Sequence, residues 1–252
     1  MTASRRSPAD SGANLVPMTS TPLRPPSPHG VGAAAHPSAE PLAWPGLFDA
    51  PDTVDRVWTD FVAGLPDPAH RTALHRALAF ARARHAGQFR RGSETPYWVH
   101  LVRVAMELSQ WGVRRPEMLQ AALLHDTVED THTSIDEIRI GFGEEVADLV
   151  DWLTAPSRED DLREYYERLH AAAPFEVQLL KLADRVDNLR SIQALVMRTG
   201  ERYRRWAGHY LRRTVWQVLP LAAAAPSVAR VALVTAMADL APLIDDGGFT
   251  DP

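Results

Sequence analysis

One histidine and three carboxylates follow an apolar stretch near the middle of the chain. The stretch 119–124 leads directly into His125, Asp126, Glu129 and Asp130. Residues four apart share a helix face, so a continuous helix would place His125 beside Glu129, and Asp126 beside Asp130. An imidazole beside a carboxylate can bind a divalent cation, and the two following acids could orient or deprotonate a water molecule there. For this segment alone, a solvated acidic cluster at a polar helix end is the simpler interpretation.

Two further polar residues stand where apolar helices would bury them. His100 lies in the apolar run 96–105, and Asp184 lies in the run 179–189. An unpaired charge at such a position is costly, because burial removes its hydration. A cation shared by His100, Asp126 and Asp184 removes that cost for all three residues. With His125 as a fourth ligand, this mixed nitrogen and oxygen set suits manganese better than calcium or magnesium.

Composition and length limit the classes of protein to which this chain can belong. The 252 residues allow one large domain or two small ones, and a net charge of −5 is ordinary for a globular protein. The chain has no cysteine, which excludes disulfides, thiolate metal sites and a cysteine nucleophile. No apolar core follows the first six residues, and prolines and an arginine interrupt the apolar stretch 215–244. We therefore expect neither a secretory signal nor a membrane span, and a cytoplasmic location.

The remaining patterns are those of helices that could position the polar residues. Residues 1 to about 45 are rich in Pro, Ser, Ala and Gly without any period, which predicts a disordered tail. Apolar residues at helical spacing, together with caps and prolines, predict an all-α protein. The expected helices cover residues 52–65, 68–86, 96–112, 116–126, 134–140, 144–154, 159–169, 175–189, 201–219 and 227–243.

Four motifs together resemble those of a known family. They are Gln-Phe-Arg-Arg at 88–91, Thr-Pro-Tyr at 95–97, His-Asp-Thr-Val-Glu-Asp-Thr at 125–131 and Lys-Leu-Ala-Asp-Arg at 181–185. The order His, His-Asp, Asp resembles the HD-domain metal phosphohydrolases. The residues of these motifs are similar to those of the RelA/SpoT hydrolase branch, especially those of the stand-alone small alarmone hydrolases. The match covers roughly residues 70–195.

This resemblance implies a fold and an activity. The expected fold is a single HD-domain helical bundle over residues 50–245, with core motifs in 70–195 and C-terminal helices in 201–244. The implied cofactor is one Mn²⁺ ion. The implied activity is hydrolysis of the 3′-pyrophosphate of (p)ppGpp, a small-molecule nucleotide. We expect no nucleic-acid or membrane partner, and a homo-oligomer stays open.

The resemblance also implies substrate-binding residues. Arginine guanidinium groups pair with phosphates and stack on bases. In the family, the arginine after Gln-aromatic packs on guanine. Arg90 matches it, but a loop one residue longer leaves Arg90 and Arg91 as alternatives. Asn188 matches an asparagine that holds the sugar or phosphate, and Tyr210 corresponds loosely to a ribose-contacting tyrosine. Lys181 would help to offset the phosphate charge.

The chain departs from the family pattern at two positions. Leu101 stands where the family usually has proline after the first histidine, and this leaves His100 unaffected as a ligand. Asp187 stands where many relatives have His or Tyr before the asparagine. It is expected to add negative charge near the anion site unless it points to solvent. The basic helix 201–219 also has an apolar stripe, so we expect it to pack on the core with its basic side facing the phosphates.

The expected mechanism is hydrolysis assisted by one cation. The cation lowers the pKa of water, and Glu129 and Asp130 position this water or take its proton. Attack at the phosphorus on the 3′ oxygen releases pyrophosphate. One alternative is the same metal centre acting on another nucleotide, such as NADPH, pppApp or a nucleotide monophosphate. Another is an inactive nucleotide-binding or protein-interaction module, against which the complete ligand set and the Glu-Asp pair argue.

Overall fold

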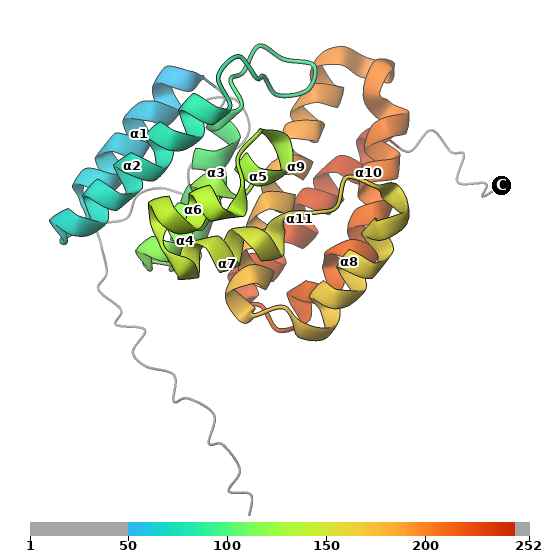
Figure 1. The fold of residues 1–252 in the computed structure, drawn as a ribbon. Helices are drawn as coiled ribbons and strands as arrows, with labels where there is room; N and C mark the ends of the chain where they lie inside the picture. Colours follow the sequence, from blue (N-terminus) through green and yellow to red (C-terminus); the bar gives the residue numbers. More distant parts are fainter. Residues whose placement is uncertain (1–49, 245–252) are drawn as a thin grey trace, which may run out of the picture. The chain divides into compact units, whose positions relative to one another are not determined.

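Helices make up almost all of the regular structure of residues 50–244, the part that this computed structural model describes (Figure 1). Within that range there is no strand, only an isolated bridge between Phe89 and Pro96. The predicted all-α class is therefore confirmed, whereas the predicted disordered tail lies outside the described residues. The helices are α1 (Pro51–Ala63), α2 (Pro68–Arg84), α3 (Trp98–Gln110), α4 (Pro116–Leu124), α5 (Thr127–Asp130), α6 (Ile135–Phe142), α7 (Glu144–Leu153), α8 (Glu159–Ala172), α9 (Phe175–Thr199), α10 (Arg204–Gln217) and α11 (Ser227–Ile244), with short 3₁₀ turns at Gly200–Tyr203 and Leu219–Ala223.

The starts of several helices follow from local chemistry. Proline occupies the first turn of α1, α2 and α4, where its missing N–H costs no hydrogen bond. The predicted capping box at α6 is present. Glu137 N donates to Ser134 Oγ at 3.2 Å, and Ser134 N donates to Glu137 Oε2 at 2.9 Å. These caps satisfy N–H groups that the helix itself leaves without partners.

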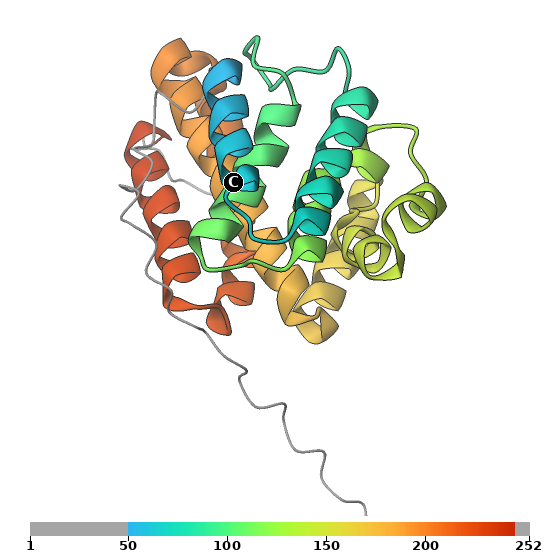
Figure 2. The same cartoon turned by 90° about the vertical axis from the view of Figure 1, so that its left-hand side faces the viewer.

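The long helix α9 runs through the centre of the bundle and contacts α3, α7, α10 and α11 (Figures 1 and 2). A second set of contacts joins α4 to α2, α3 and α7. The core between these helices is made of fully buried leucines, among them Leu101, Leu119, Leu123, Leu180 and Leu189. Each such side chain contributes about 1.5–3 kcal/mol through burial. This core holds α3, α4 and α9 in fixed positions.

Helix α9 is longer than expected from the sequence. The predicted helix ended at Leu189, whereas α9 continues to Thr199 and stops before Gly200, whose φ is 64°. The extra turns bury Ile192, Leu195 and Val196 against the rest of the molecule. Polar residues after Leu189 obscure the helical period of the sequence there. Tertiary packing therefore keeps this part of the chain helical. The extension matters because it forms one wall of a cavity described below.

Two of the expected helix boundaries near the polar cluster are wrong. Helix α3 begins at Trp98, and Pro96 lies before it in the bridge to Phe89. Helix α4 ends at Leu124, so no continuous helix carries His125 through Asp130. The hydroxyl of Thr127 donates to the Leu124 carbonyl at 2.6 Å. A new helical turn then starts at Asp126, whose carbonyl accepts from Asp130 N at 2.8 Å.

The last described helix, α11, covers Ser227–Ile244, close to the expected range 227–243. The prolines interrupt the apolar stretch 215–244 as expected, since α10 ends at Gln217 and α11 begins after Pro226, whereas Arg230 lies within α11 and does not interrupt it. By length and composition alone, its 18 residues with a mean hydropathy of 1.6 could cross a membrane. One face, including Leu233, Ala236 and Leu240, is buried, and the helix contacts α9 and α10. Only 22% of the helix is buried, and Val228, Val231 and Val234 are exposed, so this packing accounts for only part of its apolar composition.

Candidate active site

Four side chains from three parts of the chain converge between α3, α4 and α9. His100 comes from α3, His125 and Asp126 follow α4, and Asp184 comes from α9. His125 Nε2 lies 3.1 Å from Asp126 Oδ2 and 3.7 Å from Asp184 Oδ1. His100 Nε2 lies 3.5 Å from Asp126 Oδ2 and 3.4 Å from Asp184 Oδ1. The four predicted ligands therefore form one cluster, which we call the histidine–aspartate cluster.

The histidine–aspartate cluster fits a divalent cation. One ligand atom each from His100, His125 and Asp126 lies within 4.8 Å of the others. Among the described residues, neither His100 Nε2 nor His125 Nε2 has a hydrogen-bond partner, although both atoms are buried. The opposite ring nitrogen of His125 is 2.9 Å from the Ala122 carbonyl. Such a contact favours the tautomer that leaves Nε2 free for a metal.

The charges within the cluster favour a bound cation. Burial raises the pKa of Asp126, but the neighbouring histidines more than offset this and hold the pKa well below its ordinary value. Burial lowers the pKa of His125, yet Asp126 and Asp184 raise it well above its ordinary value. The same negative field that attracts a proton to the imidazole attracts a metal ion. Protons and a metal therefore compete for this position.

Metal removal is expected to lower the thermal stability of the protein. A cation that binds only the folded state, and whose free concentration is 100 times its Kd, stabilises that state by about 2.7 kcal/mol. For a domain of this size, about 2–4 °C accompany each kcal/mol, so saturating Mn²⁺ should raise Tm by about 5–11 °C. Differential scanning calorimetry with Mn²⁺ and with EDTA measures the shift. An unchanged Tm would contradict cation binding by the folded protein.

Asp187 corrects one expectation from the sequence. Its side chain is 2% exposed, so it does not point to solvent, and it does not line either cavity described below. It accepts from Arg103 Nε at 2.7 Å and lies 2.6 Å from His100 Nδ1. Burial raises the pKa of Asp187, but Arg103 and His100 hold it below its ordinary value. The added negative charge is therefore neutralised by partners within the core.

The two predicted catalytic acids lie beside the cluster but are held differently. Glu129 accepts from Ala155 N at 2.9 Å, so the loop after α7 positions its carboxylate. Asp130 Oδ2 lies 2.8 Å from the hydroxyl of Tyr97, which is also 2.7 Å from Asp126 Oδ2. Burial is the main cause that raises the pKa of both Glu129 and Asp130. A carboxyl with a raised pKa is a better proton acceptor near neutral pH.

Tyr97 is a site residue that the sequence interpretation missed. Its single hydroxyl proton can go to only one of Asp126 and Asp130 at a time. Burial and the two carboxylates raise the pKa of Tyr97, so it stays a neutral donor. Its ring stacks on His85 with centroids 4.6 Å apart. The Thr-Pro-Tyr motif was noticed in the sequence, but only the structure places its tyrosine between the two acids.

Two adjoining cavities open beside the histidine–aspartate cluster. The cavity on the cluster side, with a volume of about 360 Å³, is called the acidic cavity. Its lining includes Asp126, Glu129, Asp130, Lys181, Asp184, Asn188, Tyr210 and Arg213. The second, of about 450 Å³, is called the arginine cavity; its lining includes Phe89, Arg90, Arg91, Arg103, Asn188, Arg198, Trp206 and Tyr210. Tyr97, Asn188 and Tyr210 line both cavities.

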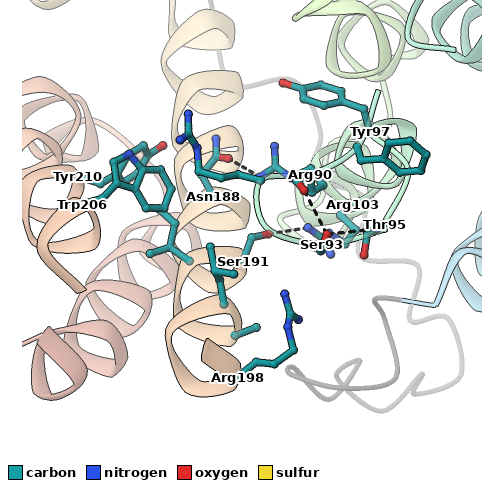
Figure 3. Close-up of a pocket in the computed structure, with 15 residues that line it drawn as sticks. Arg90, Ser93, Thr95, Tyr97, Arg103, Asn188, Ser191, Arg198, Trp206 and Tyr210 are labelled. Atoms are coloured by element: carbon teal, nitrogen blue, oxygen red, sulfur yellow. Dashed lines mark hydrogen bonds between the residues drawn. The ribbon is translucent and has the colours of Figure 1, made fainter. Parts of the chain in front are cut away.

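The arginine cavity suits an anionic ligand with a planar group. Every charged residue in its described lining is an arginine. Arg90 donates to Asn188 Oδ1 at 2.6 Å, and Arg91 lies over the Trp206 ring at 4.9 Å from its centroid. Figure 3 shows Trp206 and Tyr210 on one side of the cavity, opposite Tyr97. Arg198 and Trp206 were not predicted, because Arg198 lies beyond the expected end of its helix at Leu189 and Trp206 lies outside the recognised motifs.

The loop between α2 and α3 is held close to α9 at this cavity. Arg198 donates to the Gly92 carbonyl at 3.0 Å. Gly92 has φ +66°, and a Cβ there would lie 2.8 Å from Leu195 Cδ1 and 2.9 Å from the Tyr203 hydroxyl. Only glycine combines this backbone conformation with so close an approach. The position of the arginines in the loop therefore depends on the extended part of α9.

Positively charged side chains also line the acidic cavity. Lys181 is buried and its Nζ lies 3.5 Å from Asp184 Oδ2. Burial lowers the pKa of Lys181, but Tyr165, Tyr166 and Asp184 raise it well above its ordinary value, so it is charged. Of the arginines predicted to face the phosphates from the C-terminal helix, only Arg213 lines this cavity. The other arginines of this helix, at 202, 204, 205 and 212, line neither cavity.

Comparisons with known proteins agree with this geometry. The HD domain family matches residues 77–217. A guanosine-3′,5′-bis(diphosphate) 3′-pyrophosphohydrolase of Aquifex aeolicus is 40% identical over 130 residues, which cover 50% of this chain and 18% of that enzyme. The human enzyme MESH1, which has the same activity name, is 39% identical over 125 residues, which cover 47% of this chain and 69% of that enzyme. The chain thus spans only a small part of the longer relatives.

A solved structure shows the same arrangement of helices. It is described as a metazoan ortholog of SpoT that hydrolyzes ppGpp and plays a role in starvation responses. The two chains are 28% identical with a TM-score of 0.58, and the match covers 69% of this chain and 96% of that one. The family match over residues 77–217, the 39% identity over 69% of MESH1 and the likeness to the SpoT ortholog show that the chain belongs to the HD domain family, in its RelA/SpoT hydrolase branch.

Proposed function

We propose that this protein is a manganese-dependent phosphohydrolase that removes the 3′-pyrophosphate of (p)ppGpp, giving GDP or GTP and pyrophosphate. The observation that carries the proposal is the junction of two cavities. One contains a cluster fit for a divalent cation and a pair of acids with raised pKa. The other contains arginines and aromatic rings. A nucleotide with phosphates at both ends of its ribose matches both.

The chemistry of the cavities orients the substrate. Guanine and the 5′-phosphates occupy the arginine cavity, because aromatic faces and guanidinium groups bind planar rings and phosphate oxygens. The 3′-pyrophosphate then reaches the acidic cavity, where the cation and Lys181 offset its charge. Asn188 and Tyr210 line both cavities, which supports a role for them in binding the ribose.

Protein side chains supply the proton transfers of the hydrolysis. When bound, the cation polarises a phosphoryl oxygen and lowers the pKa of water. One of Glu129 and Asp130 takes the proton of the attacking water, and the other positions this water. The water oxygen forms a bond to the phosphorus on the 3′ oxygen, and the bond between that phosphorus and the 3′ oxygen breaks. The proton taken from the water is returned through solvent to the 3′ oxygen, and pyrophosphate leaves.

Replacing Arg90 with alanine is expected to raise KM more than it lowers kcat. Arg90 lies in the arginine cavity, 5.5 Å from the centroid of the Tyr97 ring, and is remote from the scissile bond in the proposed pose. A hydrogen bond to a charged group is worth about 1.5–3 kcal/mol, so KM for ppGpp should rise about 10–100-fold. Steady-state kinetics measures both constants, with exposed Arg163 on α8 changed to alanine as the control. A change confined to kcat would contradict this placement.

The function is tested by identifying the products. Purified protein is incubated with Mn²⁺ or EDTA and separately with ppGpp, pppGpp, pppApp or NADPH. Release of pyrophosphate from ppGpp in the presence of Mn²⁺ is expected. Orthophosphate from NADPH with no reaction of ppGpp would overturn the proposed substrate and support the alternative nucleotide. Tight alarmone binding with no turnover in any reaction would support an inactive binding module.

A further inference from the structure

A chain of buried polar contacts between α3 and α9 ends at the histidine–aspartate cluster. Asp187 Oδ2 lies 2.6 Å from His100 Nδ1. Arg103 donates from Nε to Asp187 Oδ1 at 2.7 Å and from Nη2 to Asp187 Oδ2 at 2.9 Å. Arg103 Nη2 also donates to Ser191 Oγ at 2.6 Å. Both carboxylate oxygens of Asp187 thus have donors, and one of them faces the histidine ring.

The contact with Asp187 determines which nitrogen of His100 is available to a metal. The proton of the imidazole lies on Nδ1 when that atom donates to the carboxylate. Nε2 then carries the free lone pair, and it is this atom that lies 3.5 Å from Asp126 Oδ2 and 3.4 Å from Asp184 Oδ1. His100 is 0% exposed, so solvent cannot replace Asp187 as the partner of Nδ1.

Arg103 in turn holds Asp187 in place. A buried carboxylate without a partner would be protonated or would move toward water. The two donor atoms of the Arg103 fork fix both the charge and the plane of the Asp187 carboxylate. Arg103 also lines the arginine cavity, so the network connects that cavity to the cluster.

A second buried pair between the same helices offers a comparison. Glu107 on α3 accepts from Arg190 on α9 at 2.6 Å, and Glu107 is 5% exposed. This pair resembles the pair of Asp187 and Arg103 in the helices that it joins and in its buried carboxylate, although Arg190 is less buried than Arg103. It differs in that no hydrogen bond or ion pair of the described residues links it to a histidine of the cluster.

We propose that Asp187 is a positioning residue, which with Arg103 fixes the tautomer and orientation of His100 so that Nε2 faces the cation. The proposal depends on the proposed function only in that the cluster holds a metal. It predicts a role in metal binding that is separate from the contribution of the buried pair to folding. Loss of such a hydrogen-bonding partner of a ligand typically weakens metal affinity about 10–100-fold.

The test variant is Asp187→Asn, which preserves shape but replaces one oxygen with an amide. Arg103 donates to both carboxylate oxygens, so the amide N–H₂ opposes an Arg103 N–H in either orientation and breaks the fork that fixes the side chain. In the orientation that keeps the oxygen on Arg103 Nε, the N–H₂ also faces His100 Nδ1 and forces the imidazole proton to Nε2. That tautomer cannot bind a metal through Nε2. The Kd for Mn²⁺, measured by isothermal titration calorimetry on nucleotide-free protein, should rise about 10–100-fold. Glu107→Gln is the matched control and should leave this Kd unchanged, although it also removes a buried ion pair.

The outcomes separate positioning from a general structural role. An unchanged Kd in Asp187→Asn, or an equal loss of affinity in Glu107→Gln, would overturn the proposal. Thermal unfolding in EDTA shows whether both variants fold. If Asp187→Asn does not fold, NMR of the wild-type protein loaded with diamagnetic Zn²⁺ decides. A slowly exchanging proton on His100 Nδ1 supports the proposal, and a proton on Nε2 refutes it. If the wild-type protein binds Mn²⁺ but does not hydrolyse ppGpp, the proposed function is overturned and the positioning role of Asp187 is not.

Discussion

Changing Asp184 to alanine is expected to abolish metal binding and turnover together. Asp184 is the carboxylate that α9 contributes to the cluster, with Oδ1 3.4 Å and 3.7 Å from the Nε2 atoms of the two histidines. Its loss removes a ligand and leaves the buried charge of Lys181 without its nearby carboxylate. The effect should exceed the roughly 10–100-fold loss that follows removal of a residue that only supports a ligand.

Metal content by mass spectrometry and pyrophosphate release from ppGpp measure this effect. His125→Ala should behave in the same way, because His125 Nε2 is a buried nitrogen of the cluster. The matched control is Asp148→Ala, since Asp148 is exposed on α7. Near-normal turnover in Asp184→Ala would refute the assignment of the ligands. Loss of activity with full metal content would instead place Asp184 in substrate binding.

Changing Glu129 to glutamine is expected to keep the metal but lose most of the activity. Glutamine is nearly the same shape, and its amide oxygen can still accept from Ala155 N, so the loop after α7 keeps its position. It cannot take a proton from water at neutral pH. Loss of a general base costs typically 10²–10⁴-fold, so kcat should fall by about that factor while KM changes little.

Single-turnover kinetics with saturating Mn²⁺ checks the chemical step directly. Glu164→Gln serves as the control because Glu164 is exposed on α8. Loss of metal together with activity would make Glu129 a ligand instead of a base. Unchanged turnover would assign proton transfer to Asp130, whose pKa burial also raises.

The sequence was sufficient to identify the members of the cluster, and the reason is energetic. His100 and Asp184 stand inside apolar helical patterns, where a polar side chain is tolerated only with a partner. The motif at 125–131 supplies further ligands and the two acids. Because these signals are carried by residue type and helical spacing, they can be read without coordinates, as can the all-α class.

The sequence could not show how the ligands are supported. The role of Asp187 depends on the approach of α9 to α3, since its partners His100 and Arg103 lie more than 80 residues away in the chain. Tyr97 joins Asp126 and Asp130 for a similar reason. Hydrogen bonds between distant segments leave no periodic trace in the sequence. They form only once the core has set the positions of the helices.

The local structure also differs from the helices expected from the sequence at two places where tertiary contacts determine it. The sequence suggested a continuous helix through His125 and Glu129, whereas the chain turns between α4 and α5 and Glu129 is held by Ala155. The sequence likewise ended α9 at Leu189, whereas buried contacts extend it to Thr199 and thereby build the arginine cavity. Residue types therefore determined which chemistry the protein can perform. Packing of the helices decided how its reactive groups are oriented, because orientation depends on contacts that only the folded chain makes.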